Sequence, residues 1–595
     1  MKTCSRRDHG LEKAVLAEVS ADNLWEIAER FNGIVRETGS EGERAAVKIL
    51  ADKLASWNII HKIYTPTLFV SLPRGASLKV LGPAGRTLKA KTPSFSRSTA
   101  PGSITADLSY LGSGYAETSN DIFAGIAISD AGAVKGKAVL TEGLPLPGRV
   151  TDLMAAGTAA VVYISPGERI HEGICTSIWG APDLDSIQRK PSIPVVSVSR
   201  SDGLWLKGLL DKGPVQVDVK TELEEGWKPV SVLVAEIKGS EDPDKFVLVH
   251  GHLDSWHVGV TDNATGNATL LEVARVLSKF KDRLKRSVRV AWWSGHSHGR
   301  YAGSTWYADN FALDILENCI AHVNCDSTGC RDATAYAGVS MTKEFEPLAT
   351  QAIKDVAGTP ATGARVPRAG DCSFANLGVG TFYMLLSSIP EDVRKVRGLY
   401  HVGGSGGNNE WHHEDDTIQV ADRANLLRDT KVYALSVLRA ANSTVLPYDL
   451  VGAANEIRQT VDGYVREAKG FDMTSVVQEA GALGEACGRL AAKMAPKQAE
   501  LEAKSIQDPE VKALNEAVRA VDRLLVRVNY IRGDYFKHDP ALEWAPVPDL
   551  AAAVELGKVK EGSDRYYLLC SHLRRGANKV AWTLREARQT IEGVL

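Results

Sequence analysis

Three short apolar runs, the first two separated by a helical pattern, constrain the fold of this chain more than any other feature. The runs are FVLVHGH, SVRVAWWSG and CIAHVNCDS, and ATLLEVARVLSKF between the first two has the apolar spacing of a helix. Continuous apolar runs that alternate with helices indicate a parallel sheet with both faces covered. We therefore predict an α/β fold whose central sheet is mixed and mostly parallel, with helices on both faces.

Polar residues stand where each of these runs ends. His252 closes the first run, the segment 296–298 follows the second, and Asp326 follows the third. Asp262 opens the helix after the first run, and His412 lies in a later loop. Ligands of such sheets bind at the carboxyl ends of the strands, and imidazole with carboxylate suits a divalent metal. Each residue alone is more often a structural hydrogen-bonding group or a helix cap, so the prediction of a metal site depends on their convergence.

Asp254 stands two residues after His252. From that position its carboxylate could accept a hydrogen bond from the imidazole and orient it toward a metal. We therefore predict a supporting role for Asp254 in the active site.

The length of 595 residues is too great for one hydrophobic core, and about three domains are expected. Residues 103–224 read as strand, helix, strand, helix, which predicts a small inserted α/β domain. Residues 1–102 and 225–445 would form the domain of the central sheet, and 446–595 are helical in pattern, which suits a dimerisation module.

Composition excludes several classes of partner. The chain is 44% hydrophobic and 24% charged with a formal net charge of -3, so we expect neither nucleic acid nor a membrane as partner. Charged residues interrupt the apolar positions of the first twenty residues, which predicts no secretory leader and a cytoplasmic protein. Eight cysteines without a CxxC pair fit reduced thiols.

Four motifs resemble a known family. GHLDSW, TDNATG, NCDS and EWHHEDDT are similar to signature pieces of the co-catalytic zinc peptidases, which include aminopeptidases and glutamate carboxypeptidase. Residues 103–224 resemble a protease-associated domain. LPYDLVGAANEIRQTVDGY and LLVRVNYIRGDYF are similar to the helical dimerisation domain of glutamate carboxypeptidase and the transferrin receptor. The resemblance implies a homodimeric metallopeptidase-like hydrolase.

The resemblance also implies a ligand set. His252 and Asp326 would hold one ion, Asp262 would bridge, and His412 would bind the second, with His413 as its competitor. The cofactor is expected to be one or two divalent transition metal ions, zinc first, with manganese, iron and nickel as alternatives.

The chain departs from this family at its Glu-Glu pair, which supplies a general base and then a ligand. Here the sequence is His296, Ser297, His298, and alignment from Gly295 or from Gly303 differs by one residue. One register makes His296 the base and Ser297 the ligand, and the other makes Ser297 the base and His298 the ligand. A serine hydroxyl is a poor ligand for these metals, so we predict His298 as the ligand. If the segment stays extended, His296 points the same way and serves as general base or acid.

A further stretch, RVPRAGDCSFANLGVGTFYML, is similar to the family loop that carries an aspartate and a phenylalanine near the substrate, here Asp371 and Phe374. Arg365 and Arg368 in the same stretch are candidates for binding an anionic group, with a solvated surface pair as the alternative.

The predicted function is metal-dependent hydrolysis of an amide or other C–N bond of a small molecule or short peptide by metal-bound hydroxide. The alternatives are a non-catalytic binding or scaffold protein on a transferrin receptor-like fold, or a metal-dependent lyase.

Overall fold

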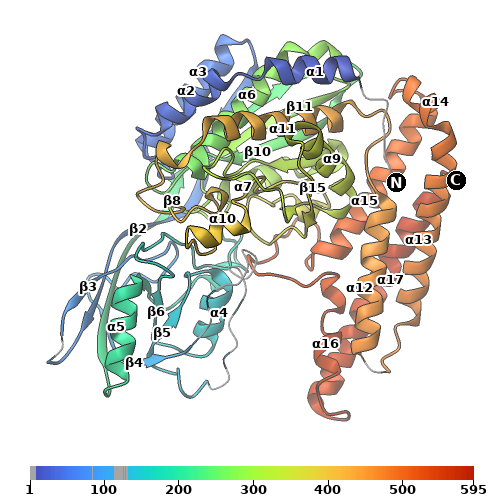
Figure 1. Ribbon diagram of the computed structural model, residues 1–595. Coiled ribbons are helices and arrows are strands. Elements are labelled where there is room, and N and C mark those ends of the chain that lie inside the picture. Colours follow the sequence, from blue (N-terminus) through green and yellow to red (C-terminus); the bar gives the residue numbers. More distant parts are fainter. Residues whose placement is uncertain are drawn as a thin grey trace.

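The computed structural model describes residues 8–468 and 470–595, apart from position 84 and segments 113–114, 116–124, 126–127 and 129–130 (Figure 1). Its central sheet has six strands in the order β1-β9-β11-β10-β12-β15. These strands are β1 (Ile60–Tyr64), β9 (Val232–Ile237), β11 (Arg286–Trp293), β10 (Asp242–His252), β12 (Cys319–Asn324) and β15 (Thr381–Phe382). β11, β10, β12 and β15 are parallel to one another, whereas β1 and β9 pair antiparallel. The predicted α/β fold with a mixed sheet is confirmed.

Helices cover both faces of this sheet. Val247 and Val249 of β10 share one core with α6 (Thr265–Lys279) and α11 (Arg423–Asn442). The alternate residues of the same strand belong to a second core on the other face, with residues of α7 (Ala302–Asn310) and α8 (Ala312–Asn318). A strand buried on both faces has no polar face, which is why the sequence runs are continuously apolar. Three further helices pack on the first face: α1 (His9–Glu18), α2 (Ala21–Phe31) and α3 (Glu41–Ser56).

The strand register aligns the ends that carry the polar residues. In the parallel pairs, His252 of β10 lies opposite Trp293 of β11, and His250 lies opposite Asn324 of β12. The residues that follow each strand therefore emerge at one edge of the sheet. Loops from three separate parts of the sequence meet there.

A second sheet has the order β3-β2-β8-β4-β5-β6-β7. Two 14-residue strands, β2 (Thr67–Val80) and β8 (Gln216–Pro229), pair antiparallel along almost their whole length. The predicted insert at 103–224 therefore omits β2 and β3, which precede it in the chain. β2 contains Pro73 and Gly75 without breaking, because the pairing with β8 shifts register between them. The remaining elements of this unit are β3 (Thr87–Lys89), β4 (Ile104–Tyr110), β5 (Ala138–Glu142), α4 (Pro147–Ala155), β6 (Ala160–Ile164), β7 (Val195–Val198) and α5 (Arg200–Leu210).

The C-terminal part is an elongated helical module beside the sheet domain, coloured orange to red in Figure 1. Its helices are α12 (Leu450–Glu467), α13 (Thr474–Met494), α14 (Gln498–Ala503), α15 (Pro509–Tyr530), α16 (Ala553–Leu556) and α17 (Asp564–Glu592). α15 is tied to the sheet domain because the Arg523 guanidinium donates to the carbonyl oxygen of Ile315 at 3.1 Å. Among the described residues, no helix has the length and apolar character that crossing a bilayer requires.

Shorter elements complete the sheet domain between β12 and α11: β13 (Val339–Ser340), α9 (Glu346–Ala357), β14 (Gly363–Ala364) and α10 (Glu391–Val396). The seven described cysteines are free thiols, and Cys4 lies outside the described residues.

Candidate metal centre and its surroundings

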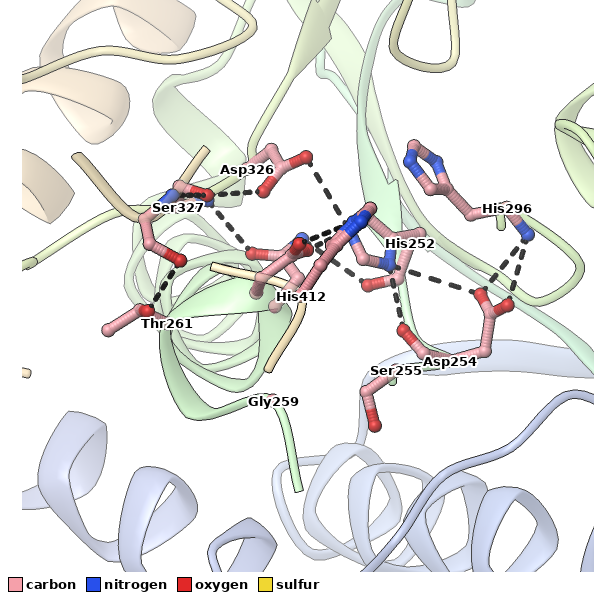
Figure 2. A network of polar contacts seen from close by, with 12 residues as sticks. His252, Asp254, Ser255, Gly259, Thr261, His296, Asp326, Ser327 and His412 are labelled. Atoms are coloured by element: carbon pink, nitrogen blue, oxygen red, sulfur yellow. Dashed lines mark hydrogen bonds and ion pairs between the residues drawn. The ribbon is translucent and has the colours of Figure 1, made fainter. Parts of the chain in front are cut away.

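Two imidazoles and two carboxylates meet at the edge where the parallel strands end (Figure 2). The Nε2 atom of His252 lies 2.9 Å from Oδ1 of Asp262 and 3.4 Å from Oδ2 of Asp326. Nε2 of His412 lies 3.1 Å from the other oxygen of Asp262. All four residues are buried. The structure thus brings together four of the predicted ligands, with Asp262 between the two histidines.

Each of three histidines at this site has its Nδ1 atom beside a fixed acceptor. Nδ1 of His252 lies 2.8 Å from the main-chain oxygen of Asp254, and Nδ1 of His412 lies 3.1 Å from that of Glu172. Nδ1 of His296 lies 2.8 Å from Oδ2 of Asp371. A ring nitrogen that faces an oxygen acceptor must carry the proton, so in the neutral ring Nε2 keeps its lone pair. This arrangement prepares an imidazole to bind a metal through Nε2.

The cluster fits a cation. Among the described residues, the buried Nε2 atom of His252 has no hydrogen-bond partner, and in the neutral ring its lone pair would face the carboxylate oxygens directly. Burial acts to lower the pKa of His252, but the Asp326 and Asp262 carboxylates outweigh it and hold that pKa well above its ordinary value. Burial would raise the pKa of Asp262, yet His252 and His412 keep it well below its usual range. The site therefore keeps Asp262 ionised and attracts positive charge.

His296 belongs to this cluster. Single donor atoms of His252, His296 and Asp326 all lie within 4.8 Å of one another, a spacing that suits one ion. The rings of His252 and His296 are stacked with their centroids 4.0 Å apart. The Asp371 carboxylate that anchors His296 also accepts from the hydroxyl of Ser304 at 2.7 Å. Burial opposes ionisation of Asp371, but His296 outweighs it and lowers the pKa of Asp371.

His298, the predicted ligand, faces away from this cluster. Its Nδ1 lies 3.0 Å from the hydroxyl of Thr38, and its ring centroid lies 4.2 Å from that of Trp256. The prediction assumed that the segment continues as an extended strand. Instead β11 ends at Trp293, Gly295 has a φ of +82°, and the amide of Tyr301 donates to the carbonyl of His296 at 2.9 Å. The chain therefore forms a compact loop, and the structure offers His296 rather than His298 as a candidate ligand.

Asp254 also differs from expectation. Asp254 orients His252 with its main-chain oxygen, while the nearest carboxylate oxygen is 3.9 Å away. Its carboxylate instead accepts from the Thr38 hydroxyl at 2.6 Å and from the main-chain amide of His296 at 3.1 Å. Asp254 thus anchors the loop that carries His296. Ser297, in the same loop, is buried.

Asp416 supports the candidate bridging residue. Its carboxylate accepts from the main-chain amides of Thr261 and Asp262, both at 3.0 Å, and so fixes the turn before α6. Burial raises the pKa of Asp416 to about 7. The neighbouring His413 interacts with Glu414 and Asp415 instead of the cluster. Of the two histidine candidates in this loop, His412 is therefore the one that reaches Asp262.

The inserted unit contributes to the site in a way that sequence reasoning missed. The amide of Glu172 donates to the carbonyl of His412 at 2.9 Å, and the carbonyl of Glu172 faces Nδ1 of the same histidine. These are main-chain contacts, so no side-chain motif signals them.

A pocket lies beside the metal-ligand cluster and is lined by Asp262, Asp326 and His412. Arg365 and Arg368 are not among its lining residues. The Arg365 guanidinium donates to the carbonyl of Asn529 at 2.6 Å, and that of Arg368 donates to the carbonyl of Asp539 at 2.8 Å. Both arginines join the sheet domain to the helical module, so they are neither anion-binding groups at the cluster nor a solvated pair.

Comparison with known proteins places this geometry in a family. Residues 233–437 match the sequence description of Peptidase family M28. The chain is 25% identical over 287 residues to a probable glutamate carboxypeptidase VP8 of Zea mays, with 45% of this chain and 39% of the relative covered. It is 26% identical over 274 residues to leucine aminopeptidase 2 of Trichophyton equinum, with 43% and 53% covered. The chain therefore spans about half or less of the length of these curated relatives.

The fold has a counterpart among solved structures. A zinc aminopeptidase from Bacillus subtilis, BSAP, aligns with a TM-score of 0.50 at 19% identity, covering 71% of this chain and 95% of that one. The matched residues 233–437 include the carboxyl ends of β10, β11 and β12, and they also include Asp262, Asp326 and His412. The family resemblance predicted from the four motifs is thus confirmed, and the chain carries a Peptidase family M28 domain over residues 233–437.

Proposed function

We propose that this protein is a metal-dependent hydrolase that cleaves an amide bond of a short peptide or a small molecule. The observation that carries the proposal is the convergence of His252, Asp262, Asp326 and His412, within a domain of a peptidase family. Such a group of imidazoles and carboxylates has no evident structural purpose, since burying it without a cation is costly.

The proposed ligands follow from the contacts. His252, His296 and Asp326 would hold one divalent ion, and Asp262 would bridge it to a second at His412. Nitrogen and oxygen donors of this kind suit zinc, with manganese, iron or nickel as alternatives, and the Bacillus subtilis protein of similar fold is a zinc aminopeptidase. When bound, such a metal supplies Lewis acidity toward a carbonyl oxygen.

The chain's own residues would prepare this chemistry. Asp371 holds the Nδ1 proton of His296 and fixes the orientation of its ring. Asp254 fixes the main chain of the same loop through the His296 amide. Leu144 and Ile174 of the inserted unit line the pocket and would give the substrate apolar surroundings.

Metal content and peptide hydrolysis test the proposal together. The protein purified without added metal should carry at least one equivalent of a transition metal by elemental analysis. It should also hydrolyse short peptides or their amide analogues, lose this activity with a chelator and regain it with zinc or manganese. A protein that carries no such metal, and whose melting temperature does not respond to added metal, would instead support a binding or scaffold role.

We also propose that the 103–224 segment is a protease-associated domain and that the helical module forms a homodimer. Supporting the dimer, α17 exposes three large apolar side chains, Tyr567, Leu568 and Trp582, with exposed fractions of 60%, 64% and 59%. Their spacing places all three on one side of the helix. Large apolar side chains exposed along one side of a helix favour association.

Trp582→Glu should shift the protein from dimer to monomer in light scattering, because a charge would be buried at the proposed interface. Leu184→Glu is the matched control, since Leu184 is 93% exposed in the inserted unit. A wild-type protein that is monomeric at micromolar concentration would contradict the proposal.

We also propose a reducing compartment such as the cytoplasm, which the buried free thiols support.

A further inference from the structure

Arg300 lies in the compact loop between His296 and α7. Arg300 lines the same pocket as Asp262, His296 and Asp326. The residue is only 3% exposed. Arg300 and Tyr301 have φ values of +48° and +71°, a backbone conformation that residues other than glycine rarely adopt. The loop thus holds an arginine in an unfavourable backbone conformation beside the proposed metal centre.

The Arg300 guanidinium has no direct hydrogen-bonding partner within the part of the chain that the structure describes. Its side chain makes no hydrogen bond or ion pair with any described residue, and its Nε atom is fully buried. The guanidinium lies over the ring of Tyr301, whose centroid is 4.5 Å away, and it interacts electrostatically with the Glu543 carboxylate without forming an ion pair. The other buried arginines of the described chain each donate at least one hydrogen bond: Arg36, Arg149, Arg275, Arg286, Arg368 and Arg523.

A buried cation without a hydrogen bond opposes folding, since burial removes hydration and the contacts that Arg300 makes replace it only in part. Backbone strain in the same loop adds to that cost. Neither feature contributes to the stability of the folded chain. Both are explained if the partner of Arg300 arrives with the substrate.

The pocket indicates the chemistry of that partner. A guanidinium is planar and matches a carboxylate through two parallel hydrogen bonds. Apolar residues also line the pocket, among them Leu144, Leu146, Ile174 and Met384. A single arginine among such residues suits a carboxylate with one negative charge better than a phosphate, which needs more donors.

We infer that the substrate carries a carboxylate that Arg300 binds, next to an apolar group that contacts the wall formed by Leu144, Leu146 and Ile174. The inference rests on the proposed hydrolase function, because it assigns a substrate class to the same pocket. In this arrangement Arg300 selects acidic substrates and holds them beside the metal-ligand cluster. Arg300 belongs to the segment in which this chain departs from the resembled family. A carboxylate-binding role for Arg300 would therefore distinguish this protein from relatives of the same fold.

Equilibrium binding tests the inference without requiring turnover. The probes are 3-phenylpropanoate and 3-phenylpropanamide, which share an apolar group and differ in the carboxylate. Calorimetry with the full-length wild-type protein should show about tenfold or greater preference for the carboxylate. Arg300→Gln should remove that preference, and Arg300→Lys should retain part of it, because lysine keeps the charge without the planar pair of donors.

Arg97→Gln is the control, since it removes one positive charge from an exposed position and should leave the preference unchanged. Melting temperature and metal content are measured for every variant, so that unfolding or metal loss is not mistaken for lost recognition. A carboxylate preference that survives Arg300→Gln would overturn the inference, since the carboxylate would then bind elsewhere. Absence of carboxylate binding to the wild type would overturn it as well.

The outcomes separate this inference from the proposed function. If carboxylate preference depends on Arg300 but no metal-dependent hydrolysis is found, the binding site stands and the hydrolase proposal fails. If metal-dependent hydrolysis is found and Arg300→Gln changes neither binding nor the KM for a carboxylate substrate, the inference alone fails.

Discussion

Asp262→Asn is expected to abolish stoichiometric metal binding and, with it, hydrolysis. Asp262 is the carboxylate whose two oxygens contact both His252 and His412, at 2.9 Å and 3.1 Å. An amide at this position keeps the shape but supplies no negative charge to either ion. Changing an outer partner of a metal ligand typically costs about 10–100-fold in affinity or activity, so loss of the bridging ligand itself should exceed that range.

Elemental analysis and thermal melting measure this outcome. Metal added to the chelated wild type should raise its melting temperature, because an ion that binds only the folded state stabilises it. The same addition should leave Asp262→Asn unchanged. Asp429→Asn is the matched control, because Asp429 is equally buried but bonds to Ser387 and Tyr336 away from the cluster. Wild-type metal content in Asp262→Asn would exclude the proposed centre.

The convergence of the candidate ligands could be predicted because it depends on regular structure. A continuous apolar run signals a strand buried on both faces, and parallel strands end at the same edge of a sheet. His252 and Asp326 follow directly from this rule, since β10 and β12 are neighbours in register. Asp262 was noticed because it opens the helix after the first run, and His412 because it lies in a polar loop, but only the family motifs assigned their roles as bridge and second-ion ligand.

The roles of His296 and His298 could not be predicted in the same way. The rule that residues two apart point in the same direction holds for an extended chain. After Trp293 the chain is no longer extended, since Gly295, Arg300 and Tyr301 all have positive φ. No local pattern in this segment specified that loop, although its extra residue relative to the family marked it as unusual.

The partners that orient the histidines are also beyond local sequence reasoning. Asp371 stands 75 positions after His296, and Glu172 stands 240 positions before His412. Asp371 was noticed through its family-like loop, but nothing in the sequence linked it to a particular imidazole. Glu172 acts through its main chain, for which the identity of the side chain carries no information.

The geometry therefore reverses the assignment of the two histidines, and a pair of alanine variants should show this. His296→Ala is expected to lower bound metal and to reduce hydrolysis by about 10²–10⁴-fold, the range associated with removal of a directly participating group. His298→Ala should retain its metal and a larger share of activity, since His298 contacts Thr38 and Trp256 instead of the cluster. The opposite pattern would support the assignment made from sequence alone.

Asp371 provides the decisive refinement of this experiment. His296→Glu restores a carboxylate of the kind found in the resembled family, but places it near Asp371, which lies 2.8 Å from the His296 ring in the native chain. Two carboxylates so close repel, and one of them would take up a proton. His296→Glu should therefore bind metal poorly, whereas His296→Glu combined with Asp371→Asn should bind it well. Recovery in the double variant would show that Asp371 is matched to an imidazole, and that the histidine of this chain is a ligand in its own right and not a degenerate remnant of the glutamate.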